Sequence, residues 1–347
     1  MRKLREAHRL SIKLFRLSIL SSIMMLLGAL PTMVANRSAL SFTKQRGAFA
    51  AVVVNDTVHT GNVFFVMTGG TDAAGHGLHP DRPFATVDFA IGQCTATQGD
   101  VIYVMPGYTE TITNSARWTV DVAGVSIIGL GHGTAKPTIT FATDTSADIL
   151  VSAANVVIKN FRMLTTIDSL VNFLDLDAAY CSIQDCDFVG DSTAQALGFI
   201  NIATTIDNFE IKRCHFEQDT DPGGTDGAVD TGVIFIIDSE NILIEDCWFN
   251  GNFETAMIHN RTTACKNLWV KNCHGQNLLS GSETFQLVDG ATGAQLGGGF
   301  NTPGEAAVTE ATLVGTIGAN FFVLSPGTYS NDGAAGGGGG IIIATPS

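Results

Sequence analysis

The chain has 347 residues, enough for one elongated domain or two compact ones, and it combines 38 glycines with only 15% charged residues. Its formal net charge of −14 is unevenly distributed, because residues 1–50 hold nine of the 19 Lys and Arg and a single acid, Glu6. The rest of the chain carries 10 basic and 32 acidic side chains. So acidic a body excludes wrapping of nucleic acid, which requires a basic surface.

Residues 1–50 form a segment with a composition of its own. Six Lys and Arg lie between Arg2 and Arg16, and an uncharged stretch follows at 17–35. This order is typical of an export signal, and 19 residues are also just enough to anchor a protein in a membrane. Two alternatives are an arm that packs in an assembly and an upstream extension missing from the mature protein. Contact with a membrane is expected only through this segment.

The next stretch, from residue 51 to 108, is expected to open the fold. An entry strand is centred on 63–66, and a Gly- and Asp-rich loop follows at 69–83. Apolar residues at 84, 87, 90 and 91 have helical spacing and predict a short helix that starts after Thr86 or Asp81. The run 101–104 predicts another strand between two turns.

A repeat dominates the middle of the chain. Five segments can be superposed, namely 155–163, 180–188, 208–216, 241–249 and 267–275. Their fourth position is always β-branched, and successive copies are 25, 28, 33 and 26 residues apart (Ile158, Ile183, Ile211, Ile244 and Val270). An earlier copy lies at 124–130. Repeats of this length indicate stacked units that cannot bury their apolar face alone.

Two further features of the repeat define the shape of each unit. The sixth position reads Gly129, Asn160, Asp185, Arg213, Asp246 and Asn272, mostly residues that tolerate the left-handed conformation of a sharp bend. A second strand precedes the later copies, at 148–153, 172–177, 199–203, 233–238 and 256–260. Short strands that each pair with their counterpart one turn later make a parallel β-helix over residues 51–290. Residues 291–347 are Gly-rich and are expected to form a cap or tail.

Cysteine fills one column of the repeat. The seventh position reads Phe161, Cys186, Cys214, Cys247 and Cys273. Neighbouring parallel strands lie about 4.8 Å apart, whereas a disulfide brings its Cβ atoms to about 3.8 Å. We therefore expect a stack of buried, free thiols that pack as small hydrophobic groups.

The block from Gly69 to Tyr108, with Pro-Phe-Ala-Thr and then Gly-Asp-Val-Ile-Tyr-Val-Met-Pro-Gly-Tyr, resembles the N-terminal cap and first rung of pectin-lyase-like β-helix proteins. The later Asn-x-x-Ile-x-Asp-Cys-x-Phe rungs are similar to the same superfamily. The resemblance covers about residues 60–280 and implies an all-β, right-handed, single-stranded parallel β-helix with a short N-terminal capping helix. The Gly-rich end of the chain is most similar to β-helix virion proteins encoded by bacteriophages.

Candidate site residues are sparse. Asp175 with Asp177, and Asp185 with Asp187, stand two residues apart, so each pair is expected to face one side of its strand, as the carboxylates of a glycosidase would. Lyases of the superfamily use an Arg or Lys base and Asp ligands to Ca²⁺; Arg162 and Arg213 are the nearest arginines to the repeat columns. Outward carboxylates on a solvated face are the alternative interpretation of all four.

Three other motifs have structural and functional interpretations side by side. The loop with Asp219, Asp221 and Asp226 could hold Ca²⁺ or could form a turn through local Asp hydrogen bonds. Gly131-His132-Gly133 matches a polygalacturonase string without its companions and is expected to be a turn. The segment 259–261 could bind a sugar or close a rung. No other cofactor motif stands out.

The sequence predicts a non-enzymatic structural or surface protein, located on a virion or on an extracellular or cell surface. Its expected partners are further copies of itself or other virion proteins. The alternative is a polysaccharide lyase or glycoside hydrolase that acts on an acidic polysaccharide in a groove along the β-helix. Outward aromatic side chains would favour this alternative, and within the repeats Trp248 and Trp269 are the candidates. Fold alone does not decide between the two.

Overall fold

A computed structural model describes the chain from Gly61 onward, within one compact unit that spans Gly61–Ser347. The described residues are 61–113, 118–190, 193–203, 206–218, 232–236, 239–253, 256–260, 266–277, 283–286, 292–301 and 320–322. The expected signal, anchor or assembly arm at 1–50 lies outside them. No helix in the described part of the chain is long and apolar enough to cross a membrane.

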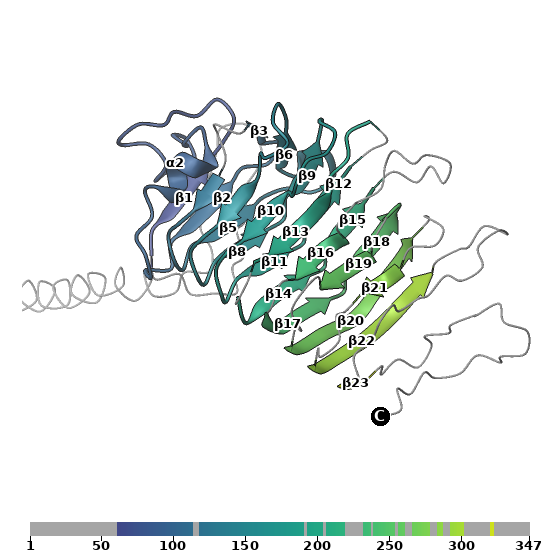
Figure 1. The fold of residues 1–347 in the computed structure, drawn as a ribbon. Helices are drawn as coiled ribbons and strands as arrows, with labels where there is room; N and C mark the ends of the chain where they lie inside the picture. The colour runs from purple at the N-terminus through teal and green to yellow at the C-terminus, as the bar shows by residue number, and fades with distance from the viewer. Residues whose placement is uncertain are drawn as a thin grey trace, which may run out of the picture. The chain divides into compact units, whose positions relative to one another are not determined.

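The described strands form a parallel β-helix, as predicted, and Figure 1 shows them stacked from the capped N-terminal end toward β23. Each turn contributes one strand to each of three faces, which we call A, B and C. Face A consists of β1 (Val63–Val66), β2 (Val101–Val104), β5 (Ser126–Gly129), β8 (Val157–Lys159), β11 (Ser182–Gln184), β14 (Phe209–Lys212) and β17 (Glu240–Glu245).

The other two faces follow the same order. Face B consists of β3 (Thr109–Ile112), β6 (Thr138–Phe141), β9 (Arg162–Thr165), β12 (Asp187–Val189), β15 (His215–Glu217) and β18 (Trp248–Gly251). Face C consists of β4 (Trp118–Val120), β7 (Ile149–Val151), β10 (Leu174–Leu176), β13 (Gly198–Ile202), β16 (Gly232–Ile236), β19 (Ala256–Asn260) and β21 (Glu283–Gln286). Strand β20 (Lys266–Asn277) continues both face A and face B.

The pairing register confirms the repeat. Ile127, Ile158, Ile183, Ile211, Ile244 and Val270 are direct partners from strand to strand along face A. Each is at most 2% exposed. Because side chains alternate across a strand, the same register places the third and fifth positions of every copy on the outer surface.

Two columns of bends separate the faces. At the bend from A to B, Asn160, Asp185, Arg213, Asp246 and Asn272 all have positive φ, as predicted. Gly129 is an exception, because its backbone is not left-handed; a Cβ there would lie 2.2 Å from the Asn160 carbonyl oxygen, so close packing explains this glycine.

The bend from C to A also has a left-handed residue in every copy, which the sequence analysis did not predict. These residues occupy the first position of the repeat, with φ between 53° and 79°: Gly124, Asn155, Tyr180, Asn208, Asn241 and Asn267. Asparagine tolerates this conformation better than most residues, which accounts for its recurrence here.

The interior consists of continuous apolar columns. The seventh-position cysteines are free and at most 2% exposed, as predicted, and the buried environment raises the pKa of the Cys214 thiol. Beside them the rings of Phe188, Phe216 and Phe249 are stacked, with centroids 5.0 and 4.8 Å apart. Such columns supply the core that one rung lacks.

A cap covers the N-terminal end, where helix α2 (Val87–Ile91) packs against β1, β2 and β4 (Figure 1). Thr86 is its N-cap, as predicted, and its hydroxyl accepts a hydrogen bond from the Phe89 amide. The carboxylate of Asp72 in turn accepts bonds from the Ala85 amide and the Thr86 hydroxyl.

Parallel pairing continues past residue 290, where the sequence analysis placed the end of the β-helix. Strand β22 (Thr292–Asn301) pairs with β20, and β23 (Asn320–Phe322) pairs with β22. The β20–β22 register shifts between Val270 and Cys273. The Gly-rich segment therefore adds strands to the ladder.

Candidate functional site

The four candidate carboxylates do not form one cluster, because they lie on different faces. Asp175 is on β10 of face C, and its Oδ1 accepts a 2.7 Å hydrogen bond from the Asn201 amide on the next strand. Asp177 follows the end of the same strand. Asp187 begins β12 on face B, and Asp185 lies at the bend before it.

The expectation that Asp185 and Asp187 share one side of a strand is wrong for a local reason. Asp185 has φ of 56°, so the alternation of side chains breaks between the two residues. Arg213 binds the Asp185 carboxylate through two nitrogens, with Nε 2.7 Å from Oδ1 and Nη2 3.2 Å from Oδ2. Lys136 Nζ lies 2.8 Å from Asp187 Oδ2.

Neighbouring cations favour the ionised form of the Asp185 carboxyl at this bend. Burial alone would raise the pKa of the Asp185 carboxyl, but the hydrogen bonds and charges of Arg213 and Lys159 outweigh it and lower that pKa. Lys136 is only 12% exposed and also donates to the carbonyl oxygen of Asp185. Both carboxylates are thus held as ion pairs, which suits a brace between turns better than an acid poised to donate a proton.

One outward column of face B brings several ionisable and aromatic side chains together. Register pairs join Arg162, Asp187, His215, Trp248 and His274 in succession. Trp248 is 54% exposed, and its ring centroid lies 5.9 Å from that of His274. Sequence analysis named Arg162, Asp187 and Trp248 separately; the common column depends on the register and could be found only by aligning the eighth positions of the copies.

The remaining motifs contribute little. The candidate calcium ligands Asp219, Asp221 and Asp226, like Arg261, lie outside the described residues. Among the described side chains, no three His, Cys, Asp or Glu lie together as a metal site would require. The 131–133 motif forms the predicted turn, with positive φ at Gly131 and Gly133, and leads into a 3₁₀ turn at Gly133–Ala135.

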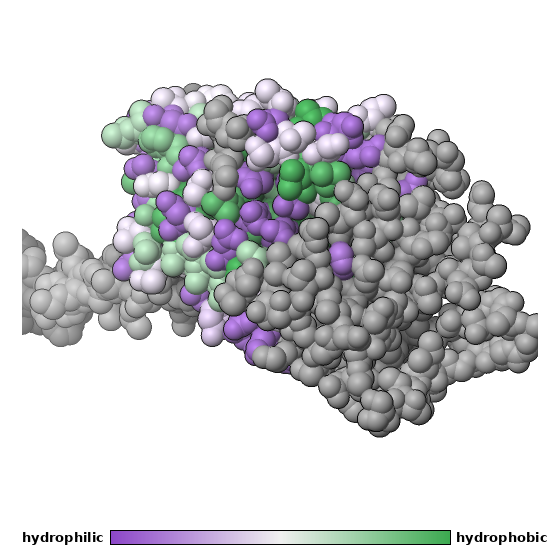
Figure 2. All heavy atoms as spheres, in the orientation of Figure 1, coloured by the Kyte–Doolittle hydropathy of each residue, from purple (hydrophilic) through white to green (hydrophobic). Residues whose placement is uncertain are grey.

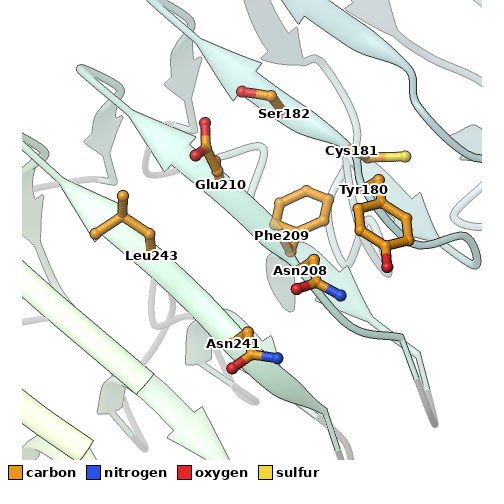
Figure 3. Close-up of a pocket in the computed structure, with 8 residues that line it drawn as sticks. All are labelled: Tyr180, Cys181, Ser182, Asn208, Phe209, Glu210, Asn241 and Leu243. Carbon is orange, nitrogen blue, oxygen red and sulfur yellow. The ribbon is translucent and has the colours of Figure 1, made fainter. Parts of the chain in front are cut away.

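A groove lies on the outer surface of face A, with a volume of about 360 Å³. Figure 3 shows its residues coming from three adjacent strands, β11, β14 and β17, and from the bends that precede them. They are Tyr180, Cys181, Ser182, Asn208, Phe209, Glu210, Asn241 and Leu243. Figure 2 shows hydrophilic and hydrophobic residues interspersed on the surface that grey atoms leave visible.

Positions in the repeat explain the lining of the groove. Tyr180, Asn208 and Asn241 occupy the first position, so their left-handed backbone turns them to the edge of face A. The third position supplies Glu210 and Leu243, which are register partners on neighbouring strands. Cys181 and Phe209 are buried beneath them. Sequence analysis missed this site because it did not assign a role to the first position.

The chain was also compared with known proteins. No protein-family model matches the sequence, and neither does any curated protein. A solved rhamnogalacturonan lyase aligns with a TM-score of 0.45 and 13% identity, covering 74% of this chain and 85% of its own. A solved chain titled "Geobacillus virus E2 - ORF18" aligns with a TM-score of 0.31 and 14% identity, covering 65% of this chain and 54% of its own.

Both alignments are partial, and the parallel β-helix of this chain is established by its own strand pairing. At these scores the likeness does not extend to an activity, a substrate or a partner. Any function has to be argued from the chain itself.

Proposed function

We propose that this protein is a non-enzymatic structural or surface component of a virion, with further copies of itself or other virion proteins as partners. The observation that supports it is the pairing of outward charges between rungs. Asp185 is bound by Arg213, Asp187 by Lys136, and Glu245 by Lys271, and in each pair the partners come from different turns. The amide of Asn272 likewise donates to Asp246 across 2.6 Å.

This arrangement favours a scaffold over a catalyst. Glycosidases need one carboxyl that keeps its proton and one that is free to attack or to activate water. Here Asp185, Asp187 and Glu245 are each paired with a cation from another rung, and these pairs tie the rungs together. A stack of in-register rungs with a braced surface is suited to a rigid, extended support, and the resemblance of the sequence to phage β-helix proteins points to the particle on which such a support is used.

Electron microscopy of the protein purified from its native source tests the proposal. We expect it in an ordered particle or lattice, where an antibody raised against the recombinant chain labels the same structure. Dispersed single rods in native material, with no label on any particle, would overturn the structural role.

The column on face B favours a second candidate, a polysaccharide lyase or glycoside hydrolase. It places Arg162, Asp187 and His215 on three consecutive strands, which lie about 4.8 Å apart in a parallel sheet. A basic side chain, a carboxylate and an imidazole at that spacing are the groups that acid–base cleavage of an acidic polysaccharide uses.

The second candidate is tested by incubating the full chain with acidic polysaccharides and measuring unsaturated products and new reducing ends. Under the structural proposal neither appears, and Asp187→Asn behaves like the parent. Turnover that Asp187→Asn or His215→Gln abolishes, while Asp175→Asn on face C retains it, would establish the enzyme instead. Asp175→Asn is a suitable control because it makes a similar change on another face.

A further inference from the structure

Tyr180 departs from its column in a way that the fold does not require. Every other copy described has Asn or Gly at this position, which suits the left-handed backbone, whereas Tyr180 adopts φ of 61° with a bulky side chain. The residue is 60% exposed, so it does not add to the core. Strained residues that the packing does not explain are concentrated at functional sites.

The ring of Tyr180 stands at one end of the groove on face A, beside amide side chains (Figure 3). The Asn267 amide donates to Asn241 Oδ1 at 2.7 Å, which leaves the Asn241 NH₂ group for another acceptor. The backbone N–H of Asn208 donates to the Glu240 carbonyl oxygen, whereas its side-chain amide has no hydrogen-bonding partner among the described residues. An amide offers both a donor and an acceptor, the combination that a hydroxyl group matches.

A second exposed ring continues the same surface. Trp269 is the register partner of Leu243 and is 41% exposed. Three strand spacings separate the rung of Tyr180 from that of Trp269, or roughly 14 Å at the usual spacing of parallel strands. A ligand along face A would therefore meet an aromatic face, a row of amides and a second aromatic face, which suits an oligomer better than a single small molecule.

The charge of the groove decides between neutral and charged ligands. Its carboxylate, Glu210, forms an ion pair with Lys212 on the same strand, with Nζ and Oε2 2.9 Å apart. The chain beyond residue 50 has an excess of acidic over basic side chains, which repels polyanions. Neither a cluster of cations nor an unpaired carboxylate lines the described groove, so a neutral ligand fits it best.

We propose that the groove on face A binds a neutral oligosaccharide. The apolar face of a sugar ring packs on Tyr180, and its hydroxyl groups bond to the amides of Asn208 and Asn241. Trp269 receives a further unit of the chain. This site does not depend on whether the protein is a virion component or an enzyme, and it is distinct from the column of Arg162, Asp187 and His215 on face B.

The test uses the full chain and an array of neutral glucan, galactan, mannan and xylan oligomers, with oligogalacturonates as charged probes. We expect binding to at least one neutral oligomer, confirmed by calorimetry. Tyr180→Asn installs the residue of the neighbouring copies and should weaken binding roughly tenfold or more, because it removes the ring. Its melting temperature should be unchanged or higher, since Asn tolerates the bend.

Two matched variants complete the experiment. Tyr180→Phe keeps the ring and should bind nearly as well as the parent. Trp248→Ala removes an exposed ring from face B and should leave binding unchanged. The proposal is overturned if no neutral oligomer binds, if an oligogalacturonate binds more tightly than every neutral probe, or if Tyr180→Asn binds as tightly as the parent.

Discussion

The N-terminal cap and the rungs of this protein are stabilised in opposite ways. In the cap, single buried polar side chains hold unique contacts: Asp100 is fully buried and accepts hydrogen bonds from the amides of Asn62 and Thr95, at 2.5 and 2.6 Å. In the rungs, apolar columns fill most of the interior, and the ion pairs that join neighbouring turns lie on the surface. Removing a buried polar side chain should therefore destabilise the cap, whereas truncating a buried apolar side chain should destabilise the rungs.

The largest effect is expected inside the rungs. Phe216 is fully buried and stacks on Phe188 and Phe249, so Phe216→Ala should lower the free energy of unfolding by about 3–5 kcal/mol. Chemical denaturation measures the change. His215→Ala alters the outward neighbour on the same strand and should cost much less; equal costs for the two variants would contradict the view that the interior columns carry the stability.

In the cap, Asp100→Ala should come next. It removes the acceptor of two part-buried backbone amides, those of Asn62 and Thr95, at a cost of about 1–3 kcal/mol. Asp144→Ala is the matched control, because that carboxylate caps an exposed turn through Ser146. If Asp100→Ala is as stable as Asp144→Ala in denaturant, the cap does not rely on its buried carboxylate.

A third comparison uses pH. Glu110 accepts hydrogen bonds from the Tyr108 hydroxyl and the Trp118 indole, and burial outweighs them and raises the pKa of its carboxyl above 4.5. A raised pKa means that Glu110 adds stability below pH 4.5 and that this contribution is lost as the pH rises through the folded-state pKa.

Glu110→Gln should remove the loss of stability that accompanies ionisation of this carboxyl as the pH rises. The difference in unfolding free energy between parent and variant, measured by denaturation across a pH series, should favour the parent most at the acid end. A difference that grows with rising pH would show that the carboxylate is stabilised in its charged form instead.

The smallest effect is expected at a surface brace of the rungs. Arg213 binds Asp185, but its side chain is 46% exposed, so Arg213→Ala should cost only about 0–1 kcal/mol. Raising the salt concentration should shrink the difference from the parent. If Arg213→Ala destabilised the protein as much as Asp100→Ala, the ion pairs on the rung surface would be as important for stability as the buried carboxylate of the cap.

The sequence predicted the repeat, the β-helix and the free thiols because each rests on side chains that recur at matching positions. Ile158, Ile183 and Ile211 had to be partners once the copies were aligned. The groove could not be predicted in the same way. Its central residue, Tyr180, stands in a column whose other members are Asn or Gly. A search for recurring residues therefore does not single it out.

Other failures have equally local causes. Gly129 shares a column with left-handed residues, yet it is required by the approach of the Asn160 carbonyl, a contact one turn away. The separation of Asp175 from Asp187 depends on which face each strand joins, and the alternation rule used for Asp185 holds only within a strand. Neither fact can be read from the spacing of residues along the sequence.

The constant length of one bend limits where residues can be inserted into the chain. The bend between faces A and B is two residues long in four successive copies, between β8 and β9, β11 and β12, β14 and β15, and β17 and β18. The longest repeat spacing, between Ile211 and Ile244, includes the long connection from β15 to β16. Insertions such as an epitope tag should therefore be accepted between faces B and C, whereas even a single extra residue between A and B would shift the next face B strand out of its column.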